Sequence, residues 1–141
     1  MGKIWRIANY LYNKRWKLGR LFEVVNFVIN SNSISAKVLI GKTTVFHHHG
    51  LGCVIHDNTE IGENCHIFQN VTIGSKWPKG KSEGNCPKIG NNVFIGAGAV
   101  ILGNISIGDN AIIGANSVVM ESVRENVMVA GVPAVIKKGK L

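Results

Sequence analysis

The sequence repeats with a period of six residues. Large apolar residues recur at this interval in three stretches: Ile34, Ile40 and Phe46; Ile55, Ile61, Ile67 and Ile73; and Ile89, Ile95, Ile101, Ile107, Ile113 and Val119. The next residue is often glycine, and the fourth residue after each is usually small or β-branched. A period of six matches neither the 3.6-residue turn of an α-helix nor the two-residue alternation of a strand. The pattern therefore predicts a repeat structure.

A short strand followed by a turn accounts for each six-residue unit. The apolar residue would point inward, and we expect the glycine to relieve the bend. Three units would close a triangular coil of eighteen residues, so that residues i and i+18 stack roughly 4.8 Å apart. Ile55 would stack on Ile73, Ile89 on Ile107, and Ile95 on Ile113. The stacked side chains would form one continuous core, and the fold class is therefore all-β, a parallel β-helix.

The period is broken in two places. Phe46 and Ile55 are nine residues apart, and the run His47, His48 and His49 lies between them, directly before a Gly-x-Gly. Between Ile73 and Ile89, residues 75–87 (SKWPKGKSEGNCP) are polar, basic and rich in glycine and proline, which predicts an extruded loop. In a rigid repeat scaffold such departures are where function is usually carried.

The two ends of the chain differ from the repeats. Apolar residues in the N-terminal segment, residues 1–32, recur at three-, four- and seven-residue steps, which predicts helix, with Gly19 as a point of division. Residues 1–30 hold six basic residues and one acidic residue, together with Trp5 and Trp16. This segment would cap the β-helix, lie on an anionic membrane, or do both. The β-helix would cover residues 33–138, with a tail over 120–141 that leaves the repeat pattern.

Composition narrows the class of protein further. A chain of 141 residues with 45% hydrophobic and 17% charged residues is a globular domain. Its three cysteines form no C-x-x-C pair, which favours a reducing compartment, and we expect a cytoplasmic location. No signal peptide or membrane-spanning run is evident. The net charge of +8 permits nucleic-acid binding, but no basic–aromatic motif supports it.

Several motifs together resemble the hexapeptide-repeat acyltransferases. They are the hexads of IGDNAIIGANSVV (107–119), the His-Gly element at 49–55, the loop ending in CPKIG, and the closing VMVAGVPAVI (127–136). Serine acetyltransferases and the surface-polysaccharide O-acetyltransferases are the most similar branches, over about residues 34–138. The resemblance implies a left-handed β-helix and a homotrimer.

The same resemblance implies an acetyl-CoA site in a groove between neighbouring β-helices. Ala97 and Ala115 would lie along the pantetheine arm, although tight coil packing explains these small residues equally well. Gly131, Pro133 and Lys137 would hold the adenine and the phosphates, because lysine suits phosphate as a mobile point charge. We expect Asn70 and Cys86 to line the acceptor site.

The histidine run would supply the general base for acyl transfer to a hydroxyl. A neutral imidazole near pH 7 suits removal of the hydroxyl proton. His49 is the first choice, because it immediately precedes the glycine-containing turn. His48 is the second, because counting forward from Ile40 places the family's base there, and His47 would face elsewhere. His56 and His66 occupy ordinary hexad positions and are expected at the surface.

Two alternatives come from other classes of protein: a metal-dependent, carbonic-anhydrase-like hydratase and a non-catalytic β-helix. A metal site in such a fold needs ligands on successive coils and across an interface. Here no histidine follows the loop, and the side chains of adjacent histidines diverge. We therefore expect no metal.

Two departures from the serine acetyltransferase pattern bear on the acceptor. No carboxylate precedes the histidine run at the family's position, so Ser33, Ser35 or a backbone carbonyl would orient the base. Cys86 stands where that family has a second active-site histidine. The sequence thus favours a sugar hydroxyl of a surface polysaccharide precursor as acceptor, with the serine hydroxyl as the alternative.

Overall fold

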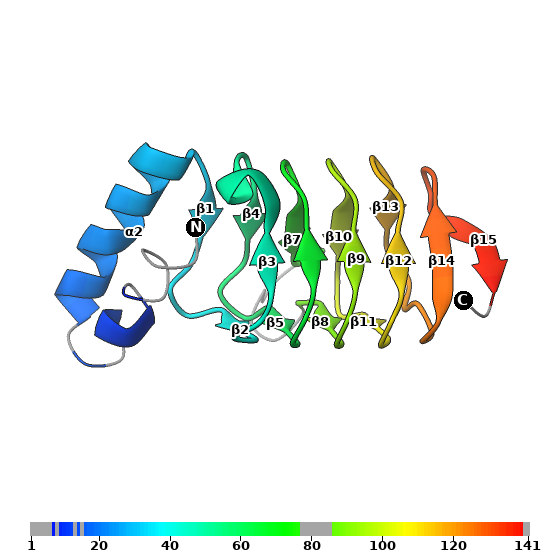
Figure 1. Cartoon of the computed structure of the whole chain (residues 1–141), viewed down its shortest axis with the longest axis horizontal. Helices are drawn as coiled ribbons and strands as arrows, with labels where there is room; N and C mark the ends of the chain where they lie inside the picture. Colours follow the sequence, from blue (N-terminus) through cyan, green and yellow to red (C-terminus); the bar gives the residue numbers. More distant parts are fainter. Residues whose placement is uncertain (1–6, 8, 13, 15, 77–85, 140–141) are drawn as a thin grey trace.

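The chain forms a parallel β-helix with a helix at its N-terminal end (Figure 1). The computed structural model describes residues 7, 9–12, 14, 16–76 and 86–139. Residues 77–85 of the expected loop, and Trp5, lie outside this part of the chain. The predicted β-helix is confirmed, because three parallel sheets form the three faces of a prism.

Each face is built from every third strand along the chain. Face 1 contains β1 (Ser33–Ile34), β4 (Val54–Ile55), β7 (Thr72–Gly74), β10 (Val100–Leu102) and β13 (Val118–Val119). Face 2 contains β2 (Leu39–Ile40), β5 (Glu60–Ile61), β8 (Lys88–Ile89) and β11 (Ser106–Ile107). Face 3 contains β3 (Val45–Phe46), β6 (His66–Ile67), β9 (Phe94–Ile95), β12 (Ile112–Ile113), β14 (Val127–Ala130) and the antiparallel β15 (Val135–Gly139).

The register of the strands follows the eighteen-residue coil. Ile55 pairs with Ile73, Ile89 with Ile107, and Ile95 with Ile113, as predicted. The pairings that span either insertion are offset. Ile34 pairs with Ile55, which leaves three extra residues at the histidine run, and Ile61 pairs with Ile89, which leaves ten extra residues at the loop. Both insertions therefore leave the stack of strands intact.

The core is a set of stacked aliphatic columns. In most strands the first residue faces outward and the second is buried, so that Ile67, Ile95 and Ile113 are fully buried on face 3. Small or β-branched residues such as Val38 and Ala99 fill the corners of the coil. Each buried isoleucine contributes about 1.5–3 kcal/mol relative to exposure, which no isolated hexad could obtain.

The turns at the prism edges rely on asparagine for their left-handed residues. Asn64, Asn70, Asn92, Asn110, Asn116 and Asn126 have φ between 54° and 60°. Asparagine adopts this conformation more readily than most residues other than glycine. Gly96, in contrast, has an ordinary φ, but a Cβ there would lie 2.6 Å from the backbone nitrogen of Ala115 in the next coil. Glycines of this kind permit close stacking rather than the bend we expected them to relieve.

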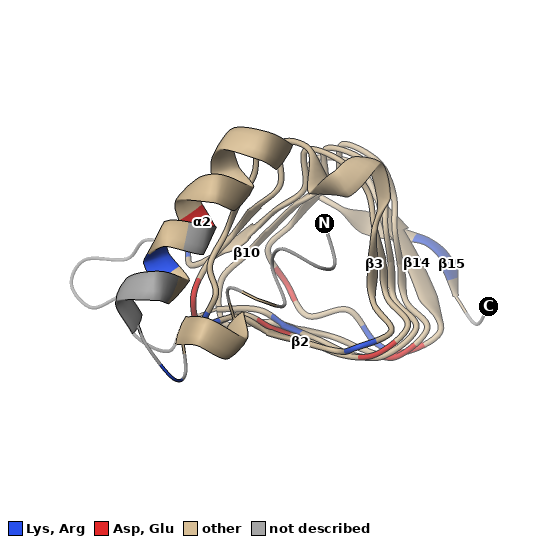
Figure 2. Ribbon diagram, turned by 60° about the vertical axis from the view of Figure 1, so that its left-hand side comes forward, with Lys and Arg blue, Asp and Glu red and all other residues tan. Residues whose placement is uncertain are grey.

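The outer surfaces of the three faces differ in polarity. Face 2 carries charged residues, and Nζ of Lys88 lies 3.0 Å from Oε1 of Glu60. Charged residues gather along the lower side of Figure 2, where β2 is labelled. Faces 1 and 3 present apolar side chains, and Val45, Val54 and Phe94 are each about two fifths to one half exposed. Only faces 1 and 3 therefore offer apolar outer surface on several strands.

The helix α2 (Trp16–Asn30) lies at the N-terminal end of the β-helix, beside β1 and the outer side of face 1 (Figures 1 and 2). Gly19 lies inside α2 rather than between two helices. A Cβ on Gly19 would come 2.6 Å from the Cα of Tyr12, so this glycine permits close packing of residues 9–12, which are helical. Among the described residues, no helix has the length and apolar character needed to cross a membrane.

The C-terminal tail leaves the repeat later than the sequence indicated. Met128 and Val129 of β14 pair in parallel with Ile112 and Ile113, so the coil continues to Ala130. The chain then reverses, and β15 pairs with β14 in the antiparallel direction. The tail therefore closes face 3.

Candidate active site

The three extra residues of the histidine run form a strained turn at one edge of the prism. His47–Gly50 form the short kinked turn η1 after β3. Inside it His48 (φ 50°, ψ 38°) and His49 (φ 60°, ψ 16°) are left-handed, and Gly50 follows with φ 71°. A left-handed non-glycine residue costs roughly 1–2 kcal/mol, and such strain tends to occur at functional sites. The conformation needs support from its surroundings.

Backbone hydrogen bonds supply part of that support. Leu51 N–H donates to the His48 carbonyl (3.1 Å), Cys53 N–H to the Gly50 carbonyl (3.0 Å), and Gly52 N–H to the Ser31 carbonyl (2.9 Å). These three N–H groups are therefore occupied, and they are not free to stabilise an oxyanion.

A chain of asparagine side chains connects the turn to α2. Asn30 donates through Nδ2 to Asn26 Oδ1 (2.8 Å), Asn26 to Asn32 Oδ1 (2.6 Å), and Asn32 to the His49 carbonyl (3.1 Å). Asn26 and Asn32 are each only 2% exposed. Buried amides with satisfied partners fix a conformation firmly, because an unpaired buried amide is costly. The sequence did not indicate this link, since asparagine in a helix gives no sign of a distant partner.

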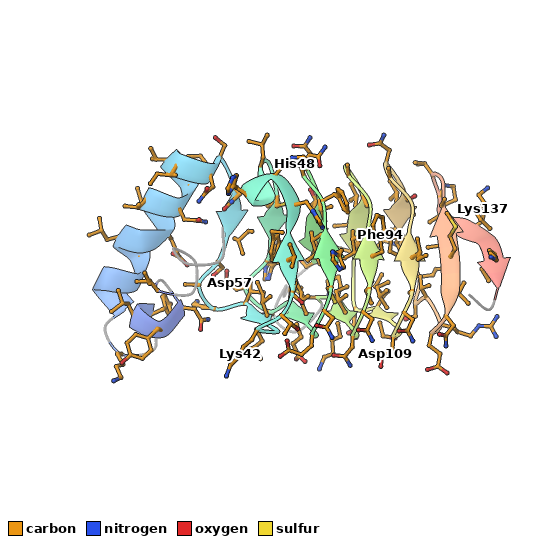
Figure 3. The ribbon with its side chains drawn as sticks, viewed as in Figure 1. Lys42, His48, Asp57, Phe94, Asp109 and Lys137 are labelled. Atoms are coloured by element: carbon orange, nitrogen blue, oxygen red, sulfur yellow. The ribbon has the colours of Figure 1, made fainter. Side chains whose placement is uncertain are left out.

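His47 is directed onto face 3, as expected for a residue that faces elsewhere. Its ring stacks on Phe68, with ring centroids 4.2 Å apart, and its Nε2 lies 3.0 Å from Nδ1 of His66. His66 is exposed, as predicted. His48 and His49 are both exposed, and Figure 3 shows His48 at the margin of the prism above the strands. The turn thus leaves His48 and His49 as candidate bases.

The residues expected to orient the base lie in different places. Ser33 is adjacent to the turn, because its N–H donates to the Cys53 carbonyl (2.8 Å). Ser35 lies at the other end of β1, where its Oγ donates to Glu23 Oε1 (3.4 Å). Ser33 is therefore the serine that lies near the histidine run.

The edge that begins with the histidine turn continues along the whole β-helix, and we call it the histidine edge. It comprises residues 47–53, 68–71, 96–99 and 114–117, which connect face 3 to face 1, and residues 131–134, where the chain turns from β14 into β15. Hydrogen bonds join its coils: Asn70 N–H to the Leu51 carbonyl, Gly98 N–H to Gln69, Asn116 N–H to Ala97, and Gly131 N–H to Ser117 Oγ. The structure therefore aligns His48, His49, Asn70, Ala97, Ala115, Gly131 and Pro133 along one edge. Lys137 is exposed on β15 (Figure 3).

Cys86 lies at a different edge, where face 1 turns into face 2. It is 3% exposed, and burial raises the pKa of its thiol. Its Sγ lies 3.1 Å from Nδ1 of His56, which is half-buried rather than a plain surface residue as we expected. One signal in the sequence could have revealed this pair, since the residue after Ile55 is His56, where Ile61 and Ile73 are followed by glycine.

A cavity of about 850 Å³ lies between α2 and face 1. Its polar lining includes Arg20, Glu23, Lys37, His56 and Asp57. Burial alone would raise the pKa of Asp57, but hydrogen bonds from Lys37 and Ser35 and the charge of Lys37 outweigh it and lower the pKa. The Lys37–Asp57 ion pair is 3.1 Å long. The part of the chain that the structure describes holds no group of three or more metal-ligating side chains.

The comparisons with known proteins agree on one group of enzymes. The family model for bacterial transferase hexapeptide (six repeats) matches residues 86–120. The serine acetyltransferase of Staphylococcus epidermidis is 42% identical over 134 residues, 94% of this chain and 61% of the relative. A solved serine acetyltransferase from Brucella abortus in complex with coenzyme A has a TM-score of 0.91 and 34% identity, covering 99% of this chain and 55% of that one. A soybean serine acetyltransferase complexed with serine has a TM-score of 0.86 and 36% identity, and the match covers 94% of this chain and 54% of the soybean chain.

The β-helix of six-residue repeats, with the histidine turn at one of its edges, is consistent with the matches above. The chain belongs to the hexapeptide-repeat transferase family, and the relatives described above are serine acetyltransferases. It spans about three fifths of the length of the curated relative and about half of the solved ones.

Replacing Asn32 tests the asparagine chain. Asn32→Ala should lower the free energy of unfolding in urea by about 1–3 kcal/mol, because the buried amide of Asn26 loses its acceptor. Asn30→Ala is the matched control and should cost less, because Asn30 is only half-buried and ends the chain of hydrogen bonds. Equal losses for the two variants would show that the link to the histidine turn contributes nothing of its own.

Proposed function

We propose that the protein is an acetyl-CoA-dependent O-acetyltransferase in which His49 is the general base and His48 its neighbour. The observation that carries this proposal is the position of the strained histidine turn at the start of the histidine edge. Residues expected to bind the cofactor follow on successive coils of that same edge. Membership of the hexapeptide-repeat transferases and the coenzyme A complex of the Brucella relative support it.

Acetyl-CoA would lie along the histidine edge. Five coils separated by roughly 4.8 Å span about 19 Å from the histidine turn to Gly131 and Pro133, a length suited to an extended pantetheine arm. Ala97 and Ala115 lie between them, and their methyl groups leave room for the arm. The thioester would then meet His49, while the nucleotide would reach Gly131, Pro133 and Lys137.

A homotrimer would complete the groove. In one chain the histidine turn and Cys86 lie at opposite ends of the strands of face 1, because His49 precedes β4 and Cys86 follows β7. A neighbouring chain could bring its own Cys86 edge to the histidine edge of the first. Faces 1 and 3, which flank the histidine edge, carry the apolar outer surface that such contacts need.

The proposed reaction is direct transfer in a ternary complex. The neutral imidazole of His49 takes the proton of the acceptor hydroxyl as its oxygen bonds to the thioester carbonyl carbon. The tetrahedral intermediate then collapses, the carbon–sulfur bond breaks, and the imidazolium returns the proton to the departing sulfur of coenzyme A. Holding both substrates at one edge supplies the proximity that this step requires.

The favoured acceptor is now L-serine, because the relatives are serine acetyltransferases and one of them is complexed with serine. A sugar hydroxyl, which the sequence alone placed first, becomes the second candidate. The sugar remains a candidate because Cys86 occupies the position of the family's second histidine.

Replacing His49 tests the base. His49→Ala should lower turnover, measured as free thiol released from acetyl-CoA, by about 10²–10⁴-fold with little change in acetyl-CoA affinity. His48→Ala should cost less and His47→Ala least. The rate of the wild type should rise with pH as an imidazole loses its proton, and a chelator should have no effect. A His49→Ala enzyme that keeps more than about a tenth of the activity would transfer the role to His48 or end this assignment.

We also propose that α2 binds peripherally to an anionic membrane at the cytoplasmic face. Leu21, Val28 and Ile29 of α2 are each more than half exposed, and Val24 and Phe27, which are exposed to a similar degree, also line the cavity beside face 1. Lys14 and Arg20 are exposed nearby, whereas Glu23, the single acidic residue of α2, accepts a hydrogen bond from Ala36 N–H (2.6 Å). An apolar stripe with basic neighbours is typical of helices that lie on anionic lipid.

Flotation with anionic vesicles tests the membrane contact. The protein should float with the vesicles at low salt and less at high salt. Val28→Asp should weaken flotation, because it places a charge on the apolar stripe. Leu39→Asp is the matched control, since Leu39 is similarly exposed on face 2 (64%, against 71% for Val28). If the wild type does not float at low salt, α2 serves as a cap alone.

A further inference from the structure

The cavity between α2 and face 1 extends along the helix, because α2 runs antiparallel to β1. At the start of β1, Asn26 donates a hydrogen bond to Asn32 Oδ1 (2.6 Å). Beyond the end of β1, the N–H of Ala36 donates to Glu23 Oε1 (2.6 Å). The C-terminal part of α2 therefore lies beside the histidine edge, and its N-terminal part lies beside the edge where face 1 turns into face 2. The cavity has a different character at each of these two ends.

The end of the cavity near the histidine edge is apolar. Val24 and Phe27 line it from α2, and Val54 lines it from the outer side of face 1. Val24 and Phe27 are each 59% exposed and Val54 is 48% exposed, so these walls leave a gap instead of packing on each other. A ligand with an apolar chain would remove this surface from water, which favours its binding.

The opposite end of the cavity is polar and contains a cation without a carboxylate partner. Lys37 and Asp57 form an ion pair (3.1 Å), and the carboxylate of Glu23 accepts a hydrogen bond from a backbone N–H (2.6 Å). Arg20 also lines the cavity, and no carboxylate among the described residues forms an ion pair with it. A guanidinium binds a carboxylate well, because two parallel N–H groups meet its two oxygens.

Val24 joins the apolar end of the cavity to the apolar stripe of α2. Residues three and four apart are neighbours on the surface of a helix, so Val24 lies beside both Leu21 and Val28. These two residues are exposed and do not line the cavity. The apolar wall of the cavity is therefore continuous with the surface that we propose to contact the membrane, from which a lipid chain could enter.

We propose that this cavity binds one fatty acid, with its carboxylate at Arg20 and its chain directed toward Phe27. These two residues are seven apart, which is about 10 Å along the helix and matches a chain of roughly eight carbons. A single apolar end suits a single chain, and one guanidinium suits one carboxylate. The site is separate from the proposed reaction centre. The inference rests on the proposed membrane contact only for the source of the ligand.

Calorimetric titration of the full chain with octanoate tests the proposal. Octanol has the same chain without the charge, and acetate has the charge without the chain. Octanoate should bind about tenfold or more tightly than either of them. Affinity should also rise several-fold from butanoate to hexanoate and again to octanoate, because each step buries two more CH₂ groups. No binding of octanoate, or equal binding of octanoate and either control, would overturn the proposal.

A soluble phospholipid distinguishes a free fatty acid from a membrane lipid. Dihexanoyl phosphatidylglycerol carries two chains and one negative charge, and it should bind less tightly than octanoate, since the apolar end holds one chain. The reverse order of affinities would contradict the assignment to a fatty acid.

Variants locate binding in the cavity. Val24→Asp should weaken octanoate binding about tenfold or more, because it places a charge in the apolar wall. Val28→Asp is the matched control, one turn further along α2 and outside the cavity, and it should leave octanoate binding unchanged. Arg20→Gln should reduce the affinity for octanoate toward that for octanol, whereas Arg124→Gln, also outside the cavity, should not. All four residues are exposed, so these variants should fold.

Two results would move or remove the site. Equal losses in Val24→Asp and Val28→Asp would place the chain on the outward stripe, and unchanged binding in Val24→Asp and Arg20→Gln would end the assignment. The orientation is tested by nuclear Overhauser effects, which should connect the terminal methyl group of bound octanoate to the ring of Phe27. Contacts of that ring with the CH₂ group beside the carboxylate would contradict it.

Flotation separates this inference from the proposed membrane contact. Val28→Asp should weaken flotation with anionic vesicles and preserve octanoate binding. A protein that floats but does not bind octanoate would leave the membrane contact standing and contradict the fatty-acid site. A protein that binds octanoate in the cavity but does not float would support the site and remove the membrane contact.

Discussion

The stacking of successive coils at the spacing of hydrogen-bonded strands is the constraint on which the rest of the structure depends. Ile67, Ile95 and Ile113 lie in register on successive coils, so that each side chain shields the next one from solvent. No coil can tilt or lengthen within a face without breaking both its hydrogen bonds and its share of the core. Extra residues are therefore accommodated only at the edges, and the two insertions of this chain occur there.

This constraint explains why the candidate chemistry lies where it does. An edge insertion can adopt an unfavourable backbone conformation, because the rigid coils on either side hold its ends. His48 and His49 are left-handed in such an insertion, and the buried amides of Asn26 and Asn32 connect it to α2. α2 thus helps to support the turn as well as covering the end of the β-helix. The same helix forms the outer wall of the cavity that contains His56.

Much of the fold could be predicted from the sequence, because the period of six is a repeated signal that one misread residue does not obscure. The i and i+18 pairs, the inserted turn and the position of the loop follow from counting. The roles of Gly96 and Asn110 could not be separated in this way, since close stacking and left-handed turns both favour small or flexible residues. The strand β14 was also harder to place, because it follows its partner strand β12 by two residues fewer than the eighteen-residue period.

The candidate site could be predicted only in part. The histidine run was identified because it interrupts the period, and Ala97 and Ala115 were identified through the family resemblance. The contacts of Asn32 with His49 and of Cys86 with His56 join residues 17 and 30 positions apart. The contact of Asn32 has no periodic signature. His56 stands out in the period because it replaces a glycine, but its partner Cys86 is revealed only by the folded chain.

The most direct test of this account is a crystal structure of the protein with coenzyme A. The account predicts three copies about a threefold axis, with the coenzyme along the histidine edge between two of them. Its sulfur should lie beside His49, and its nucleotide should lie near Gly131, Pro133 and Lys137. A single copy that binds coenzyme A without a partner, or a coenzyme seated in the cavity beneath α2, would contradict it.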